Sequence, residues 1–264
     1  MILDRRLPLG KRDAEAYRRR IARRGRREPV AYITGEREFW SLPFRVTRSV
    51  LIPRPDTETL VQEGLELLEK AGFHDRAPRG GTDQGARVID VGTGSGCVAV
   101  ALAHANRRAQ VLAIDRSARA LRVAARNVER LDLVGRVTLC RGDLLGERDG
   151  ARGAGKSGRA APAHLILSNP PYVEDGDWEK LPPDIRDWEP AGALRGGPDG
   201  LAVHRRLRAD APAHLLPGGS IAVEVGVGQA AAVSALYEAG GDFEGIRVIA
   251  DLAGIPRVVS ARRR

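Results

Sequence analysis

Apolar runs alternate with amphipathic stretches along most of the chain. Helical spacing follows most of the apolar runs, with helices expected to begin near Gly96, Ser117, Gly200 and Gly228. Strands that alternate with helices form βαβ units, which build a parallel sheet covered on both faces. The pattern therefore predicts an α/β fold with a doubly wound sheet. Its expected strands are RVIDVG (87–92), VLAID (111–115), VTLCRGD (137–143), HLILS (164–168) and SIAVEVG (220–226).

The segment 246–264 departs from this alternation. Its sequence, IRVIADLAGIPRVVSARRR, contains two apolar strands joined by a tight turn with a glycine. Strands joined in this way pair antiparallel. We expect a mostly parallel sheet that finishes in a C-terminal antiparallel hairpin, which the all-parallel dinucleotide-binding version of the fold lacks.

A short element precedes the sheet. Residues Asp13–Arg24 have the spacing of one basic helix. The stretch 28–46, EPVAYITGEREFWSLPFRV, is rich in aromatic and β-branched residues, which favours a strand pair with its turn near Ser41-Leu42-Pro43. We expect residues 1–55 to form a reduced N-terminal lead-in and residues 56–264 to form the main domain.

Two further local features follow from the sequence. After LIPRPDTE (51–58) helical spacing resumes, and Thr57 or Asp56 is expected to cap that helix. The stretch 147–162 is rich in Gly, Ala and Arg without apolar periodicity, which indicates a mobile insertion with no catalytic role. The stretch 72–85 is expected to be a surface loop.

Composition limits the classes of protein to which the chain can belong. Its 264 residues suffice for one α/β core, and 42% hydrophobic with 29% charged residues is ordinary for a soluble domain. No apolar run is long enough to span a bilayer, and the N-terminus lacks the apolar stretch of a secretory signal, so a cytoplasmic location without membrane contact is expected. Cys97 and Cys140 lie in apolar patterns without metal-ligand spacing, so we expect buried thiols and no metal site.

The chain is basic, with a net charge of +9 and a pI near 10.3. Such a surface suits a phosphate-rich partner. However, much of the excess lies in Arg18–Arg20, Arg23–Arg27 and Arg262–Arg264, where solvated helix faces and tails are the favoured explanation. A nucleic-acid partner would bind only through this basic surface.

A glycine-rich turn follows the first predicted strand of the sheet. The strand passes through Asp90 into Gly92, Thr93, Gly94, Ser95 and Gly96, and an apolar helix begins there. Glycines let the backbone turn sharply and approach a ligand at the carboxyl end of a strand. Taken alone, this turn is equally typical of a nicotinamide or flavin enzyme, or of a purely structural turn.

Acidic residues end the next two strands. Asp115 can accept hydrogen bonds from both hydroxyls of a ribose, although it can also cap the helix that begins at Ser117. Asp143 can accept from an adenine amino group while Leu144 covers the ring. Together with Asp90, these residues make three acidic strand ends. Such a set suits adenosine joined to an amino acid and offers no binding site for a pyrophosphate. The pattern favours S-adenosylmethionine as the cofactor.

The tetrad Asn169-Pro170-Pro171-Tyr172 follows the next strand, after Ser168. An amide or exocyclic amine is a poor nucleophile and must be held in line with the methyl group. The Asn169 side-chain oxygen and the Pro170 carbonyl can each accept one N–H, the prolines fix the backbone, and Tyr172 offers a face for stacking. The alternative is that the prolines merely end a strand. The tetrad predicts methylation of a planar nitrogen.

These motifs make the chain similar to the N(5)-glutamine methyltransferases of peptide chain release factors, the HemK/PrmC family. The resemblance runs from about Glu28 to Val259. It rests on EPVAYITGEREFW, LIPRPDTETLV, VIDVGTGSGCVAVALA, SNPPY, EPAGALRGGPDGL, LLPGGSIAVEVG and DLAGIPRVV. It implies a Rossmann-like methyltransferase sheet. Family members usually carry a sizeable helical domain before the strand pair, which is shortened here.

The resemblance also implies a reaction and a set of site residues. Gly92–Gly96, Asp115 and Leu144 would contact S-adenosylmethionine, and Asn169 joins that group. The glutamine of the release factor's Gly-Gly-Gln loop would bind at Asn169–Tyr172. Two alternatives stay open: adenine amino-methyltransferases of nucleic acid share the tetrad, and enzymes that act on a ribosomal-protein glutamine are similar but usually carry serine after the proline-arginine pair at Arg54.

Overall fold

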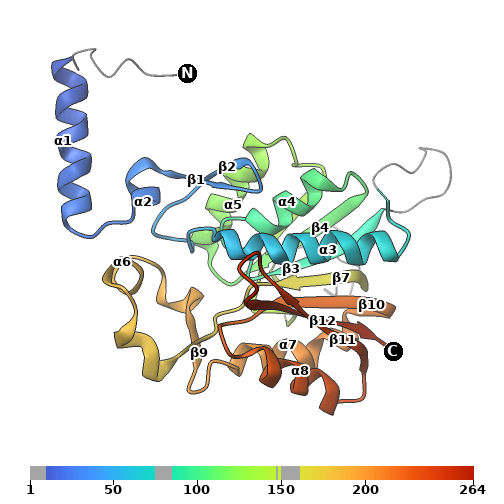
Figure 1. The fold of residues 1–264 in the computed structure, drawn as a ribbon. Coiled ribbons are helices and arrows are strands. Elements are labelled where there is room, and N and C mark those ends of the chain that lie inside the picture. The colour runs from blue at the N-terminus through green and yellow to red at the C-terminus, as the bar shows by residue number, and fades with distance from the viewer. Residues whose placement is uncertain (1–9, 75–84, 147, 150–160) are drawn as a thin grey trace.

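A central sheet with the strand order β11-β12-β10-β7-β3-β4-β5-β6 runs through the body of the protein (Figure 1). The computed structural model describes residues 10–74, 85–146, 148–149 and 161–264. Neighbouring strands from β10 to β5 pair parallel, whereas β12 pairs antiparallel with β10 and with β11. The predicted mostly parallel sheet with a C-terminal antiparallel hairpin is confirmed. The strands are β3 (Ala86–Val91), β4 (Ala109–Asp115), β5 (Val137–Gly142), β6 (Arg148–Asp149), β7 (Ala163–Ser168), β10 (Leu215–Glu224), β11 (Phe243–Ala250) and β12 (Pro256–Arg263).

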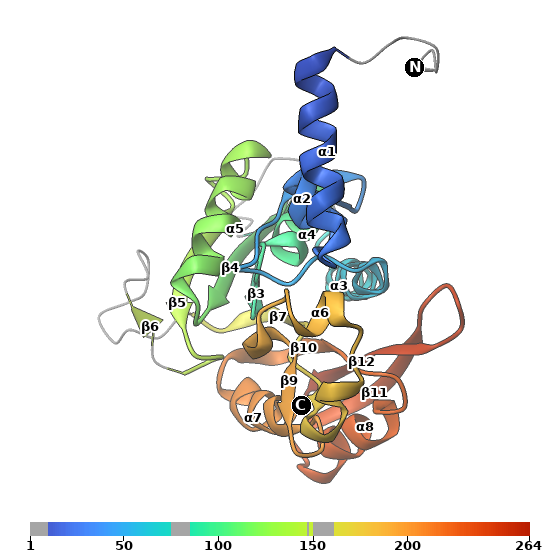
Figure 2. The same ribbon diagram turned by 90° about the vertical axis from the view of Figure 1, so that its left-hand side faces the viewer.

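Helices cover both faces of this sheet (Figures 1 and 2). Successive strand residues point to opposite faces, so Val88 packs with the helices of one face and Ile89 with those of the other. Residues of two-sided strands must be apolar throughout, which is why these strands are unbroken apolar runs in the sequence. One face carries α3 (Glu58–Lys70), α4 (Cys97–Ala105) and α5 (Ala118–Arg130), and the other carries α7 (Ala202–Asp210) and α8 (Ala230–Ala239).

Short elements complete the described chain. Most of them lie between β7 and α7, where the chain crosses the carboxyl edge of the sheet. They are η1 (Pro55–Thr57), β8 (Val173–Glu174), η2 (Asp175–Lys180), α6 (Pro183–Arg186), η3 (Ala191–Ala193), β9 (Arg195–Gly197) and η4 (Ala211–Ala213). Within the described residues, no helix has the length and apolar character needed to cross a membrane.

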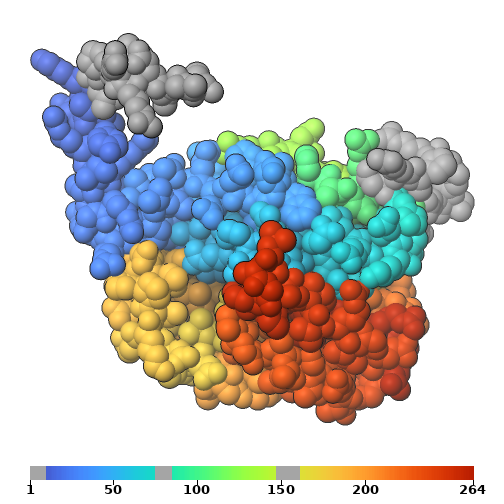
Figure 3. Space-filling view, in the orientation of Figure 1, coloured from blue at the N-terminus to red at the C-terminus, as the bar shows by residue number. Residues whose placement is uncertain are grey.

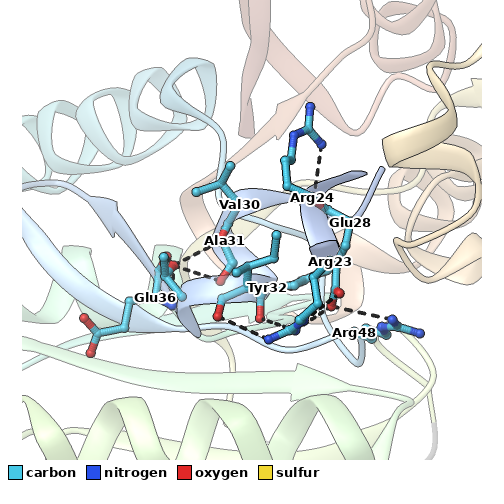
Figure 4. Close-up of polar contacts among 10 residues, drawn as sticks. Arg23, Arg24, Glu28, Val30, Ala31, Tyr32, Glu36 and Arg48 are labelled. Atoms are coloured by element: carbon cyan, nitrogen blue, oxygen red, sulfur yellow. Dashed lines mark hydrogen bonds and ion pairs between the residues drawn. The ribbon is translucent and has the colours of Figure 1, made fainter. Parts of the chain in front are cut away.

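The basic helix predicted at the start of the chain is present as α1 (Lys11–Gly25). It stands clear of the body of the protein, and none of its described residues is buried (Figure 3). Its last turn is tied down by Arg23, whose guanidinium donates to both carboxylate oxygens of Glu28 (2.8 and 2.6 Å). Arg48 also contacts Glu28, at 3.5 Å (Figure 4).

The strand predicted to begin at residue 28 was wrong over its first part, because Val30–Thr34 forms a short helix, α2. Pro29 precedes the helix and Gly35 ends it with φ of 81°. Arg23 donates to the backbone oxygen of Tyr32 at 3.2 Å (Figure 4), and the Tyr32 hydroxyl donates to Val50 at 2.6 Å. These tertiary contacts outweigh the β-propensity of the β-branched residues.

The strand pair itself is confirmed as β1 (Glu36–Phe39) and β2 (Leu42–Arg45), but its turn lies earlier than predicted. Trp40 and Ser41 form the turn with φ of 54° and 56°, the left-handed conformation that suits a two-residue hairpin. The carboxylate of Glu58 accepts from the Trp40 backbone N–H at 2.8 Å and holds this conformation in place.

The predicted capping of α3 was also wrong. Thr57 occupies the N-cap position, but its own backbone is helical because η1 runs directly into α3, and its side chain makes no cap hydrogen bond there. The Thr57 hydroxyl is instead engaged by Asn169. The two cysteines are buried as expected, and both Cys97 and Cys140 are thiols outside any disulfide. Most of the expected insertion at 147–162, and residues 75–84 of the expected loop, lie outside the described residues.

Candidate active site

The carboxyl ends of the parallel strands converge on a cavity of about 370 Å³. That volume is within the range of cofactor sites in proteins. Strand ends supply one wall, the segment before α3 supplies a second, and the segment after α6 supplies a third. From the strand ends come Gly92–Ser95, Asp115, Gly142–Leu144, Asn169 and Pro171; from the other walls come Leu51, Pro53, Arg54, Thr57, Pro190, Gly192, Ala193 and Arg195, among others.

The glycine turn has the backbone geometry that the sequence predicts. Gly92, Gly94 and Gly96 all have positive φ, of 77°, 55° and 82°. Asp90 lies buried beneath the turn and accepts from the Thr93 hydroxyl (2.6 Å) and the Ala99 backbone N–H (3.2 Å). Burial raises the pKa of Asp90 to about 7, against the pull of these two donors. Asp90 therefore fixes the conformation of the turn from the core side, and the backbone of the turn faces the cavity.

Asp115 lies on the cavity wall and supports the turn as well. Its Oδ2 accepts from the Gly94 backbone N–H at 2.9 Å, and its Oδ1 accepts from the Ser117 backbone N–H at 2.8 Å. Ser117 caps α5 itself, because its hydroxyl accepts from Ala120. Each oxygen retains a lone pair, so Asp115 can still receive hydroxyl donors from a ligand.

Asp143 and Leu144 come together on the wall after β5. Leu144 has a positive φ of 54°, and Asp143 forms an ion pair with Arg206 of α7 at 2.7 Å. The pair is exposed, so the carboxylate remains accessible to a donor from the cavity. The sequence predicts a contact of Asp143 with adenine but gives no sign of its partner Arg206.

Two residues of the tetrad after β7 line the cavity and two do not. Asn169 and Pro171 line the cavity, whereas Pro170 is buried and Tyr172 points behind the wall. The Asn169 amide donates through Nδ2 to the Thr57 hydroxyl at 3.1 Å. With Nδ2 so engaged, Oδ1 is left as the acceptor of this side chain.

Behind the tetrad lies Glu224, a buried carboxylate at the end of β10. The Tyr172 hydroxyl donates to its Oε1 at 3.4 Å, and the Thr57 hydroxyl also hydrogen-bonds to the carboxylate. Burial raises the pKa of Glu224 to about 7, although these two bonds and the charge of Arg257 lower it. Sequence reasoning missed this residue; the signal was a carboxylate inside the apolar run SIAVEVG, at the same edge as the other strand ends.

The backbone of the tetrad is fixed by close packing. Gln229 Nε2 donates to the Tyr172 carbonyl at 3.0 Å. At Gly196, a Cβ would lie 2.8 Å from the Pro171 carbonyl and 2.6 Å from that of Gly200, distances that real Cβ atoms do not show. The GGPDG segment must therefore carry glycine here for the chain to run against the tetrad.

An ion pair between a partly exposed arginine and a buried glutamate holds the second and third walls together. Arg54 pairs with Glu189, and the second oxygen of Glu189 accepts from the Ile52 backbone N–H at 3.1 Å. Burial raises the pKa of Glu189, against the opposing charge of Arg54. Sequence reasoning noted Arg54 only as part of a motif and missed its partner, which lies 135 residues away.

A second missed residue, Asn127 of α5, joins the lead-in to the glycine turn. It is fully buried. Its amide donates to the carbonyls of Ser95 (2.8 Å) and Arg45 (3.0 Å), and its oxygen accepts from the Arg45 backbone N–H (2.8 Å). A lone asparagine on an amphipathic helix gives no signal of such a role in the sequence.

Known domain models and structures agree with this arrangement. Residues 80–181 match the Methyltransferase small domain, and residues 1–35 match the PrmC N-terminal domain. A methyltransferase from Pyrococcus furiosus shares the fold at 16% identity, with a TM-score of 0.57 over 92% of this chain and 98% of that chain. The fold and the site define an S-adenosylmethionine-dependent methyltransferase, and the predicted cofactor is confirmed.

Curated relatives narrow this class. The release factor glutamine methyltransferase of Geobacter sulfurreducens is 42% identical over 97% of this chain and 80% of its own length. That of Rhodopirellula baltica is 39% identical over 94% of this chain and 78% of its own length. The chain belongs to the release factor glutamine methyltransferase family, as the sequence motifs predicted.

Proposed function

We propose that the protein methylates the side-chain amide nitrogen of the glutamine in the Gly-Gly-Gln loop of peptide chain release factors. Membership of the family supports a release-factor substrate. The observation that carries the proposal is the placement of Asn169 on the cavity wall with its Nδ2 already donated to Thr57. Its Oδ1 then accepts one N–H of an incoming carboxamide.

The residues of the cavity fit S-adenosylmethionine. The positive-φ glycine turn lets a ligand approach the backbone, and Asp115 keeps lone pairs for the ribose hydroxyls. Asp143 and Leu144 line the same cavity, and we propose that they contact the adenine. The proposed cofactor contacts are completed by Gly92, Thr93, Gly94, Ser95, Gly96 and Asn169, of which all but Gly96 line the cavity. When bound, the cofactor supplies an electrophilic methyl group.

The protein's own residues position the nucleophile. Asn169 Oδ1 and the Pro170 carbonyl accept the two N–H groups of the glutamine amide, which aims the nitrogen lone pair at the methyl carbon. Bound S-adenosylmethionine would supply the methyl group to this nitrogen and keep the electron pair of its own sulfur–carbon bond, and the nitrogen would then lose one proton to solvent. Tyr172 and Pro171 support this geometry, Tyr172 through its hydrogen bond to Glu224.

Transfer of a labelled methyl group tests the substrate directly. The protein is incubated with labelled S-adenosylmethionine and, in separate reactions, a release factor, ribosomal proteins and DNA. We expect label in the release factor. Label in ribosomal protein or DNA instead would replace this proposal with one of the two alternative substrates that the motifs leave open.

A further inference from the structure

Three side chains form a hydrogen-bonded relay that leads away from the cavity into the core. Asn169 lines the cavity and donates to Thr57, and Thr57 hydrogen-bonds to Glu224 at the end of β10. Glu224 is only 1% exposed, Thr57 is 2% exposed, and Glu224 Oε2 has no partner among the described residues. A buried acid without full pairing is costly, so its presence calls for a role.

The relay has a direction because a hydroxyl carries a single proton. An ionised carboxylate only accepts, so Thr57 gives its proton to Glu224 and can only accept from Asn169. The Asn169 NH₂ must then face Thr57, and its oxygen is left for the cavity. If Thr57 gave its proton to Asn169 instead, the amide would turn over and present NH₂ to the substrate.

We propose that Glu224 is a positioning residue that fixes, through Thr57, the amide orientation of Asn169 and so makes the site select a carboxamide or amino group over a carboxylate. This inference rests on the proposed reaction at Asn169. Glu224 is not among the residues that line the cavity, so it would act without touching substrate or cofactor. Its effect on catalysis passes entirely through the orientation of one side chain.

The protonation state of Glu224 decides the direction of the relay. The groups that face it are Tyr172 from the tetrad, Asp56 from η1, Arg257 from β12 and the Cys97 thiol from α4. With the pKa of Glu224 raised to about 7, the carboxyl gains a proton as the pH falls through neutrality. The protonated form can donate to Thr57, which frees the Thr57 proton for Asn169 Oδ1 and disfavours the productive orientation.

Glu224→Gln tests this inference because glutamine imitates the protonated acid in shape. We expect the variant to fold at least as well as the wild type, since it removes a buried charge. Its kcat at pH 8 should fall by about tenfold, with unchanged affinity for S-adenosylmethionine. The wild-type kcat should fall as the pH is lowered from about 8 to about 6, whereas the variant should be low and flat across this range.

Two variants at Thr57 distinguish the effect of its hydroxyl on the Asn169 amide from the effect of its packing. Thr57→Val keeps the shape but removes the hydroxyl, and should lose kcat by about tenfold. Thr57→Ser restores the hydroxyl and should recover most of it. The matched control is Glu63→Gln, since Glu63 is similarly buried but bonds to Ser260 of β12 and Arg247 of β11. This control should keep the wild-type kcat and pH profile.

Discrimination between glutamine and glutamate substrates tests the orientation of the Asn169 side-chain amide directly. The measured quantity is the affinity of a loop peptide with glutamate relative to one with glutamine, in competition assays. We expect Glu224→Gln and Thr57→Val to bind the glutamate peptide relatively better than the wild type does, by about tenfold in the ratio. An unchanged ratio together with an unchanged pH profile would overturn the inference.

Failure of the proposed function can be distinguished from failure of this inference. If the wild type methylates DNA or a ribosomal protein and not the release factor, the proposed substrate is wrong, and the relay is tested with the acceptor found, because each offers an NH₂ group to Asn169. A wild type that methylates none of these acceptors overturns both proposals.

Discussion

Gly94 donates its backbone N–H to Asp115 Oδ2 across 2.9 Å, which ties the glycine turn after β3 to the carboxyl end of β4. One carboxylate thus shapes the turn and faces the cavity. We expect Asp115→Ala to weaken S-adenosylmethionine binding by about 2–3 kcal/mol, the scale of a lost charge-assisted hydrogen bond. Calorimetry on the folded variant measures this. Unchanged affinity would mean that Asp115 only stabilises the glycine turn and the start of helix α5.

Asn169→Ala should retain the fold and cofactor binding but lose turnover by about a hundredfold or more, because one of two acceptors that position the nitrogen is removed. Single-turnover rates at saturating cofactor measure the chemical step. A rate within a factor of about three of the wild type would contradict the role of Asn169.

Asn127→Ala should destabilise the protein by about 2–4 kcal/mol, since it leaves the buried carbonyl of Ser95 and the partly buried backbone N–H and carbonyl of Arg45 unpaired. Because Ser95 lines the cavity, cofactor affinity should fall as well. Urea unfolding and calorimetry give the two values. Asn106→Ala is the control: Asn106 is also buried and bonds to Phe73 and Arg108, so it should lose stability but keep cofactor affinity.

Gly196→Ala should reduce turnover strongly, because its Cβ would meet backbone atoms of Pro171, Tyr172 and Gly200 at 2.8 Å or less. Backbone cannot yield as a flexible side chain can, so the tetrad must move. The matched control is Gly176→Ala, where nothing lies within 4 Å of the added atom. Equal turnover of the two variants would show that the tetrad tolerates the displacement.

Stability should depend on pH through Glu224. Its folded-state pKa of about 7 lies above its ordinary value of 4.5, so between these values the folded state holds a proton that the unfolded state lacks. Its contribution to stability therefore decreases as the pH rises from about 4.5 to about 7, by up to about 1.4 kcal/mol per pH unit. The stability of Glu224→Gln relative to the wild type should increase over that window in urea unfolding. A constant difference would mean that Glu224 titrates normally.

The sequence predicted the parts of the fold that follow from local periodicity. Unbroken apolar runs marked the two-sided strands, and the glycine turn and Asn169 could be placed at strand ends because parallel strands share one carboxyl edge. The helix at Val30–Thr34 could not be predicted, because distant contacts of Arg23 and Tyr32 stabilise it. Likewise, the partners Glu189 of Arg54 and Asn169 of Thr57 lie over a hundred residues away, and spacing along the chain carries no trace of them.

The chemistry assigned to Asn169 and Pro170 is tested most directly by mass spectrometry of a release factor's Gly-Gly-Gln loop after incubation with the protein and S-adenosylmethionine. The account predicts one added methyl on the glutamine, and none when that residue is asparagine or glutamate. Asparagine leaves the nitrogen roughly an ångström or more short of the in-line position, and glutamate sets acceptor against acceptor. An unmodified glutamine in the loop, or equal methylation of the glutamate loop, would contradict the account.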